Sequence, residues 1–182
     1  MKKLLIFLFL IFMISGCGNN SNSPKNEVKK LFSNYNSLSS DVLIQLDTVI
    51  SNEDLREDQK AIYKEVLRRQ YEDLKYKIND EVISEDKAIV SVNIEVYDLN
   101  KAITDANKYL ENNKEEFTID DKLDNNKFWD YKLDKMLKMQ DRINYTIDFS
   151  LTKLDNKWHL DELLETDRQK IHGLYSETVS TE

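Results

Sequence analysis

The chain has 182 residues, and 34 acidic against 26 basic side chains give it a formal charge of −8 at pH 7. This length suffices for one domain with a sizeable core. An acidic chain without a basic stripe argues against a nucleic-acid partner, and three glycines leave no loop to cradle a nucleotide cofactor, so we expect none.

The first residues have the pattern of an export signal. Lys2 and Lys3 precede an unbroken apolar run over residues 4–14. Such a run is too short to cross a bilayer core of about 30 Å and has the length of the central region of a signal peptide. We therefore predict a signal peptide over residues 1–16.

The end of this segment, Ile14-Ser15-Gly16-Cys17, resembles the lipobox of bacterial lipoproteins. In that motif the cysteine sulfur receives a diacylglyceryl group before cleavage exposes its amine. The alternative is an ordinary secretory leader, which is disfavoured because Ile14 is not the small residue that an A-x-A-like site needs. We predict lipidation of Cys17, which would attach the protein to membrane lipid on the extracytoplasmic side of the cell membrane.

The residues after this cysteine divide into a tether and a domain. Cys17 is the only cysteine, so an internal disulfide cannot form. Residues 18–23 read GNNSNS, which is typical of a flexible tether. We assign residues 17–23 to the lipidated cysteine and tether, and residues 24–182 to a single domain. Removal of Lys2 and Lys3 leaves a formal charge of −10, so charge does not attract the chain to anionic lipid.

Three helices are predicted to open the domain. Ser23-Pro24 fits an N-cap followed by the first helical residue. A second helix is expected near Asp41, after the break at residues 37–40, and a third is expected to be capped by Ser51 or Asn52. The inward side of the third helix is formed by Leu55, Ile62 and Val66, with Gln70 on the same line.

Alternation of apolar and polar residues predicts four antiparallel strands in two hairpins. The first hairpin covers residues 74–78 and 88–96, with a turn at residues 84–86. The second covers residues 143–152 and 157–160, with a turn at Asp155-Asn156. Ile94, Phe149 and Trp158 are expected to face the core, whereas Asn93 and Ser150 face solvent.

A helical insert is expected between the hairpins. Helical spacing of apolar residues covers residues 99–110 and 128–140, and the acidic segment 117–126 separates them. A short helix starting at Thr166, with Gln169 completing a capping box, follows the last strand. The fold class is α+β, with N-terminal helices packed on a curved four-stranded antiparallel sheet.

Several strings resemble lipoproteins of low-GC Gram-positive bacteria that have no assigned activity. They are RQYEDLKYKI at residues 69–78, AIVSVNIEVYD at 88–98, KWHLD at 157–161 and IHGLY at 171–175. The element order also resembles the nuclear transport factor 2-like (cystatin-like) superfamily. These resemblances imply an extracytoplasmic protein with a cone-shaped fold, and they carry over no catalytic residue.

The residues most capable of chemistry do not form a known site. His159 and His172 lack the spacing of a zinc motif, and we expect structural roles for both. Asp120, Asp121, Asp124 and Asn125 lack the glycine and the alternating ligands of a calcium loop. Motifs of serine nucleophiles are missing from the sequence. We therefore assign no catalytic, cofactor-binding or metal-binding residue.

Two functions remain. The first is a non-catalytic module that binds a ligand or a protein outside the cell. The second is a small-molecule enzyme that uses a buried carboxylate and a tyrosine in a cone-type pocket, and Asp148 is expected to point away from such a pocket. The aromatic residues available to line it, which we also expect to serve as plain core, are Tyr35, Tyr63, Tyr71, Tyr76, Tyr145 and Phe149.

Overall fold

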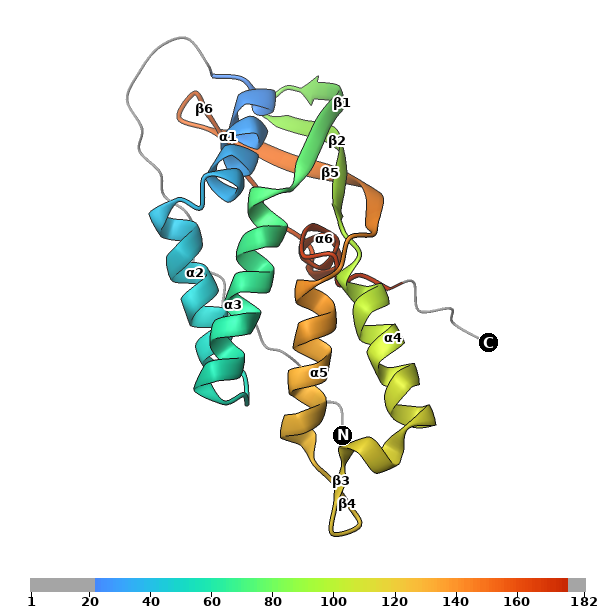
Figure 1. Ribbon diagram of the computed structural model, residues 1–182. Helices are drawn as coiled ribbons and strands as arrows, with labels where there is room; N and C mark the ends of the chain where they lie inside the picture. The colour runs from blue at the N-terminus through green and yellow to red at the C-terminus, as the bar shows by residue number, and fades with distance from the viewer. Residues whose placement is uncertain (1–21, 177–182) are drawn as a thin grey trace.

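The computed structural model describes residues 22–176, so the predicted signal peptide and Cys17 lie outside the described residues. This part of the chain contains six α-helices, a four-stranded antiparallel sheet and a two-stranded sheet (Figure 1). The elements are α1 (Pro24–Asn36), α2 (Ser40–Ser51), α3 (Glu57–Glu72), β1 (Lys75–Ser84), β2 (Lys87–Tyr97), α4 (Leu99–Asn112), the 3-10 turn η1 (Lys114–Phe117), β3 (Thr118–Ile119), β4 (Lys122–Leu123), α5 (Asn125–Leu137), β5 (Arg142–Leu154), β6 (Lys157–Leu160) and α6 (Glu165–Ile171).

The first two helices begin as predicted. The Ser23 side chain accepts a hydrogen bond from the Asn26 backbone N–H, and Pro24 is the first residue of α1. The break before α2 passes through Leu38, which has a φ of 46° in the left-handed region, and Ser39 then caps α2. The Ser-rich segment therefore works as a turn followed by a new helix start.

The predicted start of the third helix is wrong. Ser51 and Asn52 do not cap α3, because the Ser51 hydroxyl and the Asn52 amide both donate to the carbonyl of Thr48 and close the end of α2. Helix α3 begins at Glu57, where the Gln59 side chain accepts from the Arg56 backbone N–H at 3.1 Å. Serine and asparagine satisfy free carbonyls at a helix end as readily as free amides at a helix start.

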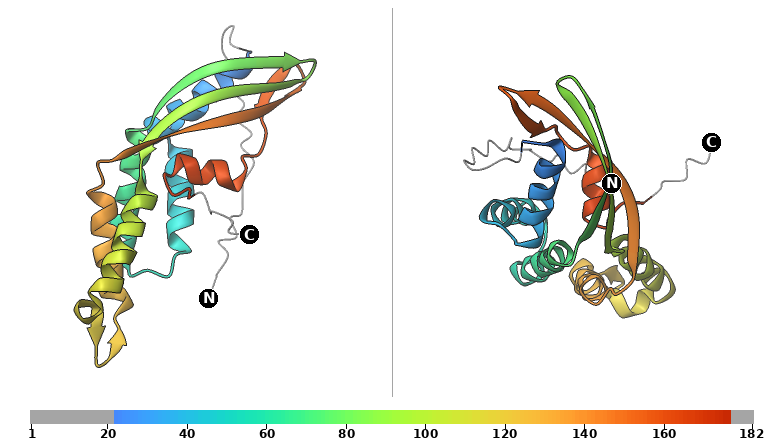
Figure 2. Two further views of the ribbon diagram at one scale, coloured as in Figure 1. Left: turned by 90° about the vertical axis from the view of Figure 1, so that its right-hand side faces the viewer. Right: turned by 90° about the horizontal axis from the view of Figure 1, so that it is seen from above.

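The large sheet has the strand order β1-β2-β5-β6, which confirms the two predicted hairpins and the insert between them. Val90 pairs with Phe149 and Ile94 pairs with Tyr145 across the two central strands. The register of β1 shifts by one residue between Ile78 and Asp80, so β1 contains a bulge. The sheet is open rather than closed into a barrel (Figure 2).

One face of this sheet forms the core. Val90, Ile94 and Phe149 are buried, whereas Asn93 and Ser150 on the opposite face are exposed, which confirms the predicted register. Figure 2 shows the helices gathered on one side of the sheet, with α1 and α6 beneath the strands. The four-stranded sheet with N-terminal helices on one face and a helical insert confirms the α+β class.

The insert forms an arm that extends away from the sheet. Helices α4 and α5 lie side by side, and the β3–β4 hairpin joins their far ends (Figures 1 and 2). The acidic segment between the predicted helices is thus an ordered hairpin, with Asp120 and Asp121 at positive φ in its turn. The arm contains a small core of its own around Phe117 and Phe128, whose rings meet edge to face at 5.6 Å.

Helix α6 closes the open end of the core. It begins at Glu165, one residue before the predicted start, and its N-cap Leu164 offers no side-chain hydrogen bond. The predicted capping box at Thr166 is therefore wrong, and the Gln169 amide donates to the Glu165 carboxylate instead. Such a contact between residues four apart stabilises a helix from its side rather than at its start.

Candidate functional site

Of the aromatic residues that we considered as pocket lining, Tyr145 packs on Tyr175 and borders a surface hollow, whereas the others belong to the core. The rings of Phe32 and Tyr76 stack at 4.4 Å, and Phe149 meets Phe32 edge to face at 5.6 Å. The ring centres of Tyr35 on α1 and Tyr71 on α3 are 4.8 Å apart. Their side chains fill the space between the helices and the sheet, which is the arrangement of a packed core.

A tyrosine–histidine pair joins α3 to the end of α6, with Tyr71 buried and His172 half-buried. The Tyr71 hydroxyl and His172 Nε2 are 2.9 Å apart, and the two rings are 5.7 Å apart. Burial lowers the pKa of His172 to about 4, with the nearby Glu165 raising it and Arg168 lowering it. His172 is therefore neutral near pH 7, and its Nε2 shares a hydrogen bond with the Tyr71 hydroxyl.

The tyrosines around this pair stay protonated. Burial raises the pKa of Tyr35 to about 12, against a small opposing effect of Arg168. Burial also raises the pKa of Tyr63 to about 12 and places the pKa of Tyr71 well above 10. A catalytic base needs a pKa close to the working pH. Burial moves the pKa of these three tyrosines further above that pH.

Gln70, which fell on the predicted inward line of α3, anchors three elements. Its side-chain oxygen accepts from the Tyr97 backbone N–H at 2.9 Å. Its amide donates to the carbonyls of Tyr97 and Ile171, so the side chain joins α3 to the end of β2 and the end of α6. A buried amide with partners on all sides fixes the relative position of the elements it joins.

Two arginines that sequence reasoning missed hold the base of the arm. The guanidinium carbons of Arg69 and Arg142 lie 3.9 and 4.2 Å from the centre of the Tyr97 ring. Arg69 also donates to the backbone carbonyls of Leu137 and Met139, which satisfies the end of α5. The only sequence signal for this role was the position of Arg69 in the last turn of α3.

A second polar contact holds the side of the arm. The buried Gln59 amide donates to Asn126 O at 3.0 Å and to Asp130 Oδ1 at 2.8 Å. Arg56 also binds Asp130 at 2.8 Å. Helix α5 is therefore attached to α3 at both ends, and the arm is a fixed extension of the fold.

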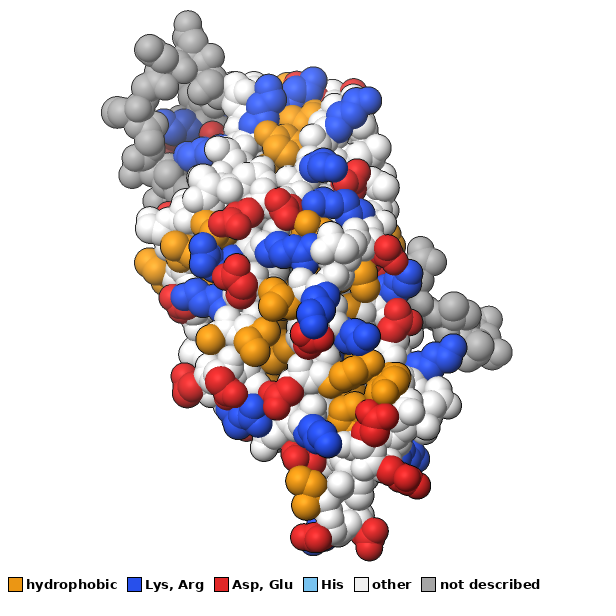
Figure 3. All heavy atoms as spheres, in the orientation of Figure 1, with side chains coloured by type: hydrophobic (Ala, Val, Ile, Leu, Met, Phe, Trp, Pro, Cys, Tyr) orange, Lys and Arg blue, Asp and Glu red, His pale blue; other side chains and the backbone are white. Residues whose placement is uncertain are grey.

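The tip of the arm presents apolar side chains to solvent. Ile119 is 57% exposed and Leu123 is 47% exposed, on either side of the Asp120-Asp121 turn. Figure 3 shows apolar side chains flanked by acidic ones at this lower tip. Because Ile119 pairs with Lys122 and Leu123 pairs with Thr118, each face of this short hairpin exposes one aliphatic side chain.

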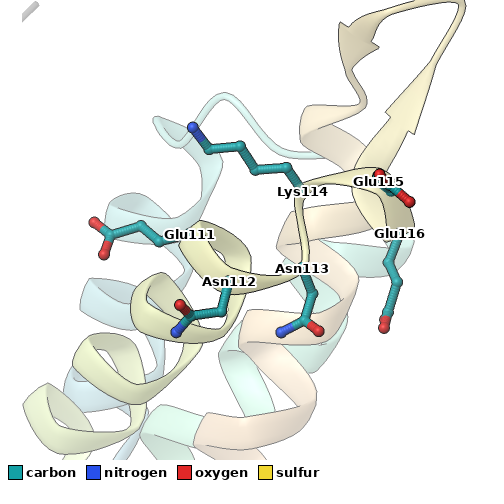
Figure 4. A pocket seen from close by; sticks show the side chains of 6 residues that line it. All are labelled: Glu111, Asn112, Asn113, Lys114, Glu115 and Glu116. Atoms are coloured by element: carbon teal, nitrogen blue, oxygen red, sulfur yellow. The ribbon is translucent and has the colours of Figure 1, made fainter.

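The hollows of the described surface do not form a catalytic cleft. One, of about 430 Å³, follows the backbone of residues 111–116, and Figure 4 shows its side chains pointing in different directions. The other, of about 420 Å³, lies beside the first turn of α4. There Asp98 caps α4 and Lys101 is paired with Asp141.

The remaining predicted residues are dispersed. His159 is half-buried on β6, and Asp148 is exposed on the outer face of the sheet, as expected. Asp124 is the N-cap of α5 and accepts from Asn126 and Lys127. Within residues 22–176, histidines, cysteines and carboxylates nowhere gather in a group that could hold a metal ion.

The predicted lipidation site, Cys17, lies outside the described residues. Over the described part of the chain, no helix has the length and apolar character needed to cross a membrane.

No family model and no curated protein matches the chain. Among solved structures, a similar one is the crystal structure of YcdA from Bacillus subtilis, described as a candidate lipoprotein. The two chains are 15% identical, and the alignment covers 85% of this chain and 48% of that one, with a TM-score of 0.38. The chain thus spans about half the length of that structure. A likeness at this level does not establish a shared fold or function.

Proposed function

We propose that the protein is a lipoprotein attached by acyl chains on Cys17 to the extracytoplasmic side of the cell membrane. Residues 1–16 are the signal peptide, residues 17–23 carry the lipid and the tether, and residues 24–182 form one domain. The support is the sequence Ile14-Ser15-Gly16-Cys17 after a short apolar run. Membership of the Gram-positive lipoprotein family and of the nuclear transport factor 2-like superfamily belongs to the same proposal.

We further propose that the domain is a non-catalytic module that binds another protein through the tip of the α4–α5 arm. The observation that carries this proposal is the exposure of Ile119 and Leu123, one on each face of a hairpin that a separate aromatic core holds in place. Exposed apolar side chains surrounded by polar ones mark surfaces that bind other proteins. A preordered hairpin also loses little conformational freedom when it binds.

The charge at the end of the arm indicates what kind of partner protein can bind there. The end of the arm carries an excess of acidic side chains over basic ones. The acidic residues are Glu111, Glu115, Glu116, Asp120, Asp121 and Asp124, and the basic residues are Lys114, Lys122 and Lys127. We expect a partner with an apolar pocket and a basic rim, because opposite charges at the rim accelerate association and exclude wrong partners.

The interior favours this module over the alternative enzyme. An enzyme of the cone type needs space for a substrate beside its tyrosine and carboxylate. Here the ring centres of Tyr35 and Tyr71 are only 4.8 Å apart, and the Tyr71 hydroxyl is hydrogen-bonded to His172. These contacts leave no space for a substrate beside the Tyr71 hydroxyl.

The test is site-specific photocrosslinking in intact cells. A benzophenone amino acid at position 119 should give a discrete protein adduct, and the neighbouring change Leu123→Ser should reduce its yield at least fivefold. The same probe at Ile44, an equally exposed residue on α2, is the matched control. Equal adducts from positions 44 and 119, or an adduct that does not depend on Leu123, would contradict the proposed contact surface.

A further inference from the structure

The described chain begins at one particular end of the large sheet. The Asn22 side chain donates to the backbone carbonyl of Asn156 and accepts from the Trp158 backbone N–H at 3.3 Å. Three residues later, the Lys25 backbone N–H donates to the Glu81 carboxylate at 2.9 Å. The start of α1 therefore lies between the β5–β6 turn and the end of β1.

Both hairpins of the sheet turn at this same end. The Lys153 backbone N–H donates to the carbonyl of Asp86 at 2.8 Å, which joins the β5–β6 hairpin to the β1–β2 turn. The Lys87 ammonium donates to the Thr152 hydroxyl at 2.6 Å. We call this region, residues 81–89 and 152–158, the hairpin end. Figures 1 and 2 show it at the opposite end of the molecule from the β3–β4 tip of the arm.

The hairpin end concentrates exposed apolar side chains. Eight large hydrophobic residues of the described chain are strongly exposed, and four of them lie here. Their exposed fractions run from 50% to 60%. They are Val82, Ile83, Ile89 and Leu154. These residues lie in the strand ends that flank two adjacent turns, with Val82 and Ile89 paired on the outer face and Ile83 paired with Ala88 on the core side. A group of exposed aliphatic residues at one end of a sheet is typical of a contact surface.

The charge of this end differs from that of the whole chain. Lys25 belongs to this end because its ammonium lies 3.6 Å from the Glu81 carboxylate. With Lys25 included, the lysines and carboxylates here are equal in number, whereas the whole chain has a formal net charge of −8. The lysines are Lys25, Lys87, Lys153 and Lys157, and the carboxylates are Glu81, Glu85, Asp86 and Asp155. Figure 3 shows basic side chains around an apolar patch at the upper end of the molecule. Aliphatic residues beside lysines, on a surface without the net negative charge of the rest of the chain, suit the boundary between lipid headgroups and acyl chains.

We propose that the hairpin end is a second membrane contact, which rests on the bilayer surface and directs the arm away from it. This inference rests on the proposed lipidation of Cys17. Asn22 is five residue steps along the chain from Cys17, and an extended chain of that length reaches at most about 18 Å. The anchor would therefore hold this end, rather than the distant arm tip, beside the headgroups. The apolar side chains enter the interface, and Lys153 and Lys157 extend toward lipid phosphates, whereas Lys25 stays paired with Glu81 and Lys87 with the Thr152 hydroxyl.

The test uses the full-length protein purified from membranes and reconstituted into vesicles of phosphatidylglycerol and phosphatidylethanolamine in equal parts. The variants Ile83→Cys and Leu154→Cys receive an environment-sensitive fluorophore, since the Cys17 sulfur is blocked by its lipid. Ile44→Cys and Ile119→Cys are controls of similar exposure elsewhere on the surface. At positions 83 and 154 we expect a blue shift of the emission and at least twofold quenching by spin-labelled lipid, with neither effect at positions 44 and 119.

The outcomes separate this inference from the anchor itself. If the wild-type protein floats with the vesicles while labels at positions 83 and 154 stay as hydrated as the controls, the anchor stands and the second contact is refuted. Failure of the wild-type protein to float refutes both. A blue shift that appears in detergent without vesicles, and grows with protein concentration, would assign the hairpin end to contact between two copies of the chain and would also refute the inference.

Discussion

Gln70 and Gly173 lie so close together that position 173 has no room for a side chain. A Cβ built on Gly173 would come within 2.5 Å of the Gln70 amide nitrogen and would collide with the carbonyl of Tyr97. The φ of Gly173 is +67°, a conformation that residues with a side chain rarely adopt. This contact fixes the end of α6 against α3 and the end of β2.

Replacement of this glycine should therefore loosen the fold. Gly173→Ala should lower the free energy of unfolding by about 2–3 kcal/mol, from backbone strain and displacement of the Gln70 side chain. Denaturant unfolding measures this change, with Ser176→Ala at the exposed residue 176 as the control. Equal stability of the two variants would show that the end of α6 does not constrain α3.

Stability should depend on pH through His172. Because its pKa falls from 6.5 in the unfolded chain to about 4 in the folded protein, the unfolded chain binds the proton first as the pH decreases. The contribution of His172 is complete above about pH 6.5 and is lost progressively between pH 6.5 and about 4. The loss should amount to about 2–3 kcal/mol.

The pH effect can be isolated with one substitution. His172→Gln keeps an acceptor for the Tyr71 hydroxyl and removes the titration, so its stability should vary less than that of wild type between pH 6.5 and 4. Urea unfolding at several pH values gives the comparison, and His159→Gln is the control on the half-buried β6 histidine. A wild-type profile that His172→Gln leaves unchanged would contradict the neutral state of His172.

The register of the sheet predicts opposite effects at neighbouring positions. Phe149 is fully buried against Phe32, and Phe149→Ala should cost about 3–5 kcal/mol of stability. Ser150 faces solvent, and Ser150→Ala should change stability by less than about 0.5 kcal/mol. Thermal or denaturant unfolding decides the matter, and similar losses at the two positions would place the wrong residues in the core.

The two tryptophans should report different environments. Trp158 is 7% exposed in the main core, so its emission should be blue-shifted in the folded protein and move to the red on denaturation. Trp129 is half-buried on the arm, with the Lys132 ammonium 3.9 Å from its ring centre. Trp129→Phe isolates the emission of Trp158, and Trp158→Phe isolates that of Trp129. Strong quenching of Trp158 by acrylamide in the folded protein would show that this residue is accessible rather than core.

Local patterns predicted most of the elements, because period two and helical spacing record which side of each element is buried. The faces of β2 and β5 and the inward position of Trp158 follow from alternation alone. The boundary between α2 and α3 was missed, since Ser51 and Asn52 can bind either a helix start or a helix end. The β3–β4 hairpin was missed because its turn is Asp-Asp, which is a weaker signal than Asn-Gly.

The contacts that tie the elements together depend on residues far apart in the chain. Tyr71 and His172 are 101 residues apart, and Arg69 reaches the end of α5 almost 70 residues away. No local pattern indicates such partners. The exposure of Ile119 and Leu123 could not be predicted from the sequence either, because an aliphatic residue in a short strand is normally expected to be buried.

The most direct test of the account is the intact mass of the protein purified from membranes. A lipoprotein predicts a mature chain that starts at Cys17 and carries a diacylglyceryl group on its sulfur. Cys17→Ser should then leave the precursor uncleaved and without lipid. A mature protein that carries no lipid, or a Cys17→Ser variant that is cleaved and partitions into detergent as the wild type does, would contradict the proposed anchor.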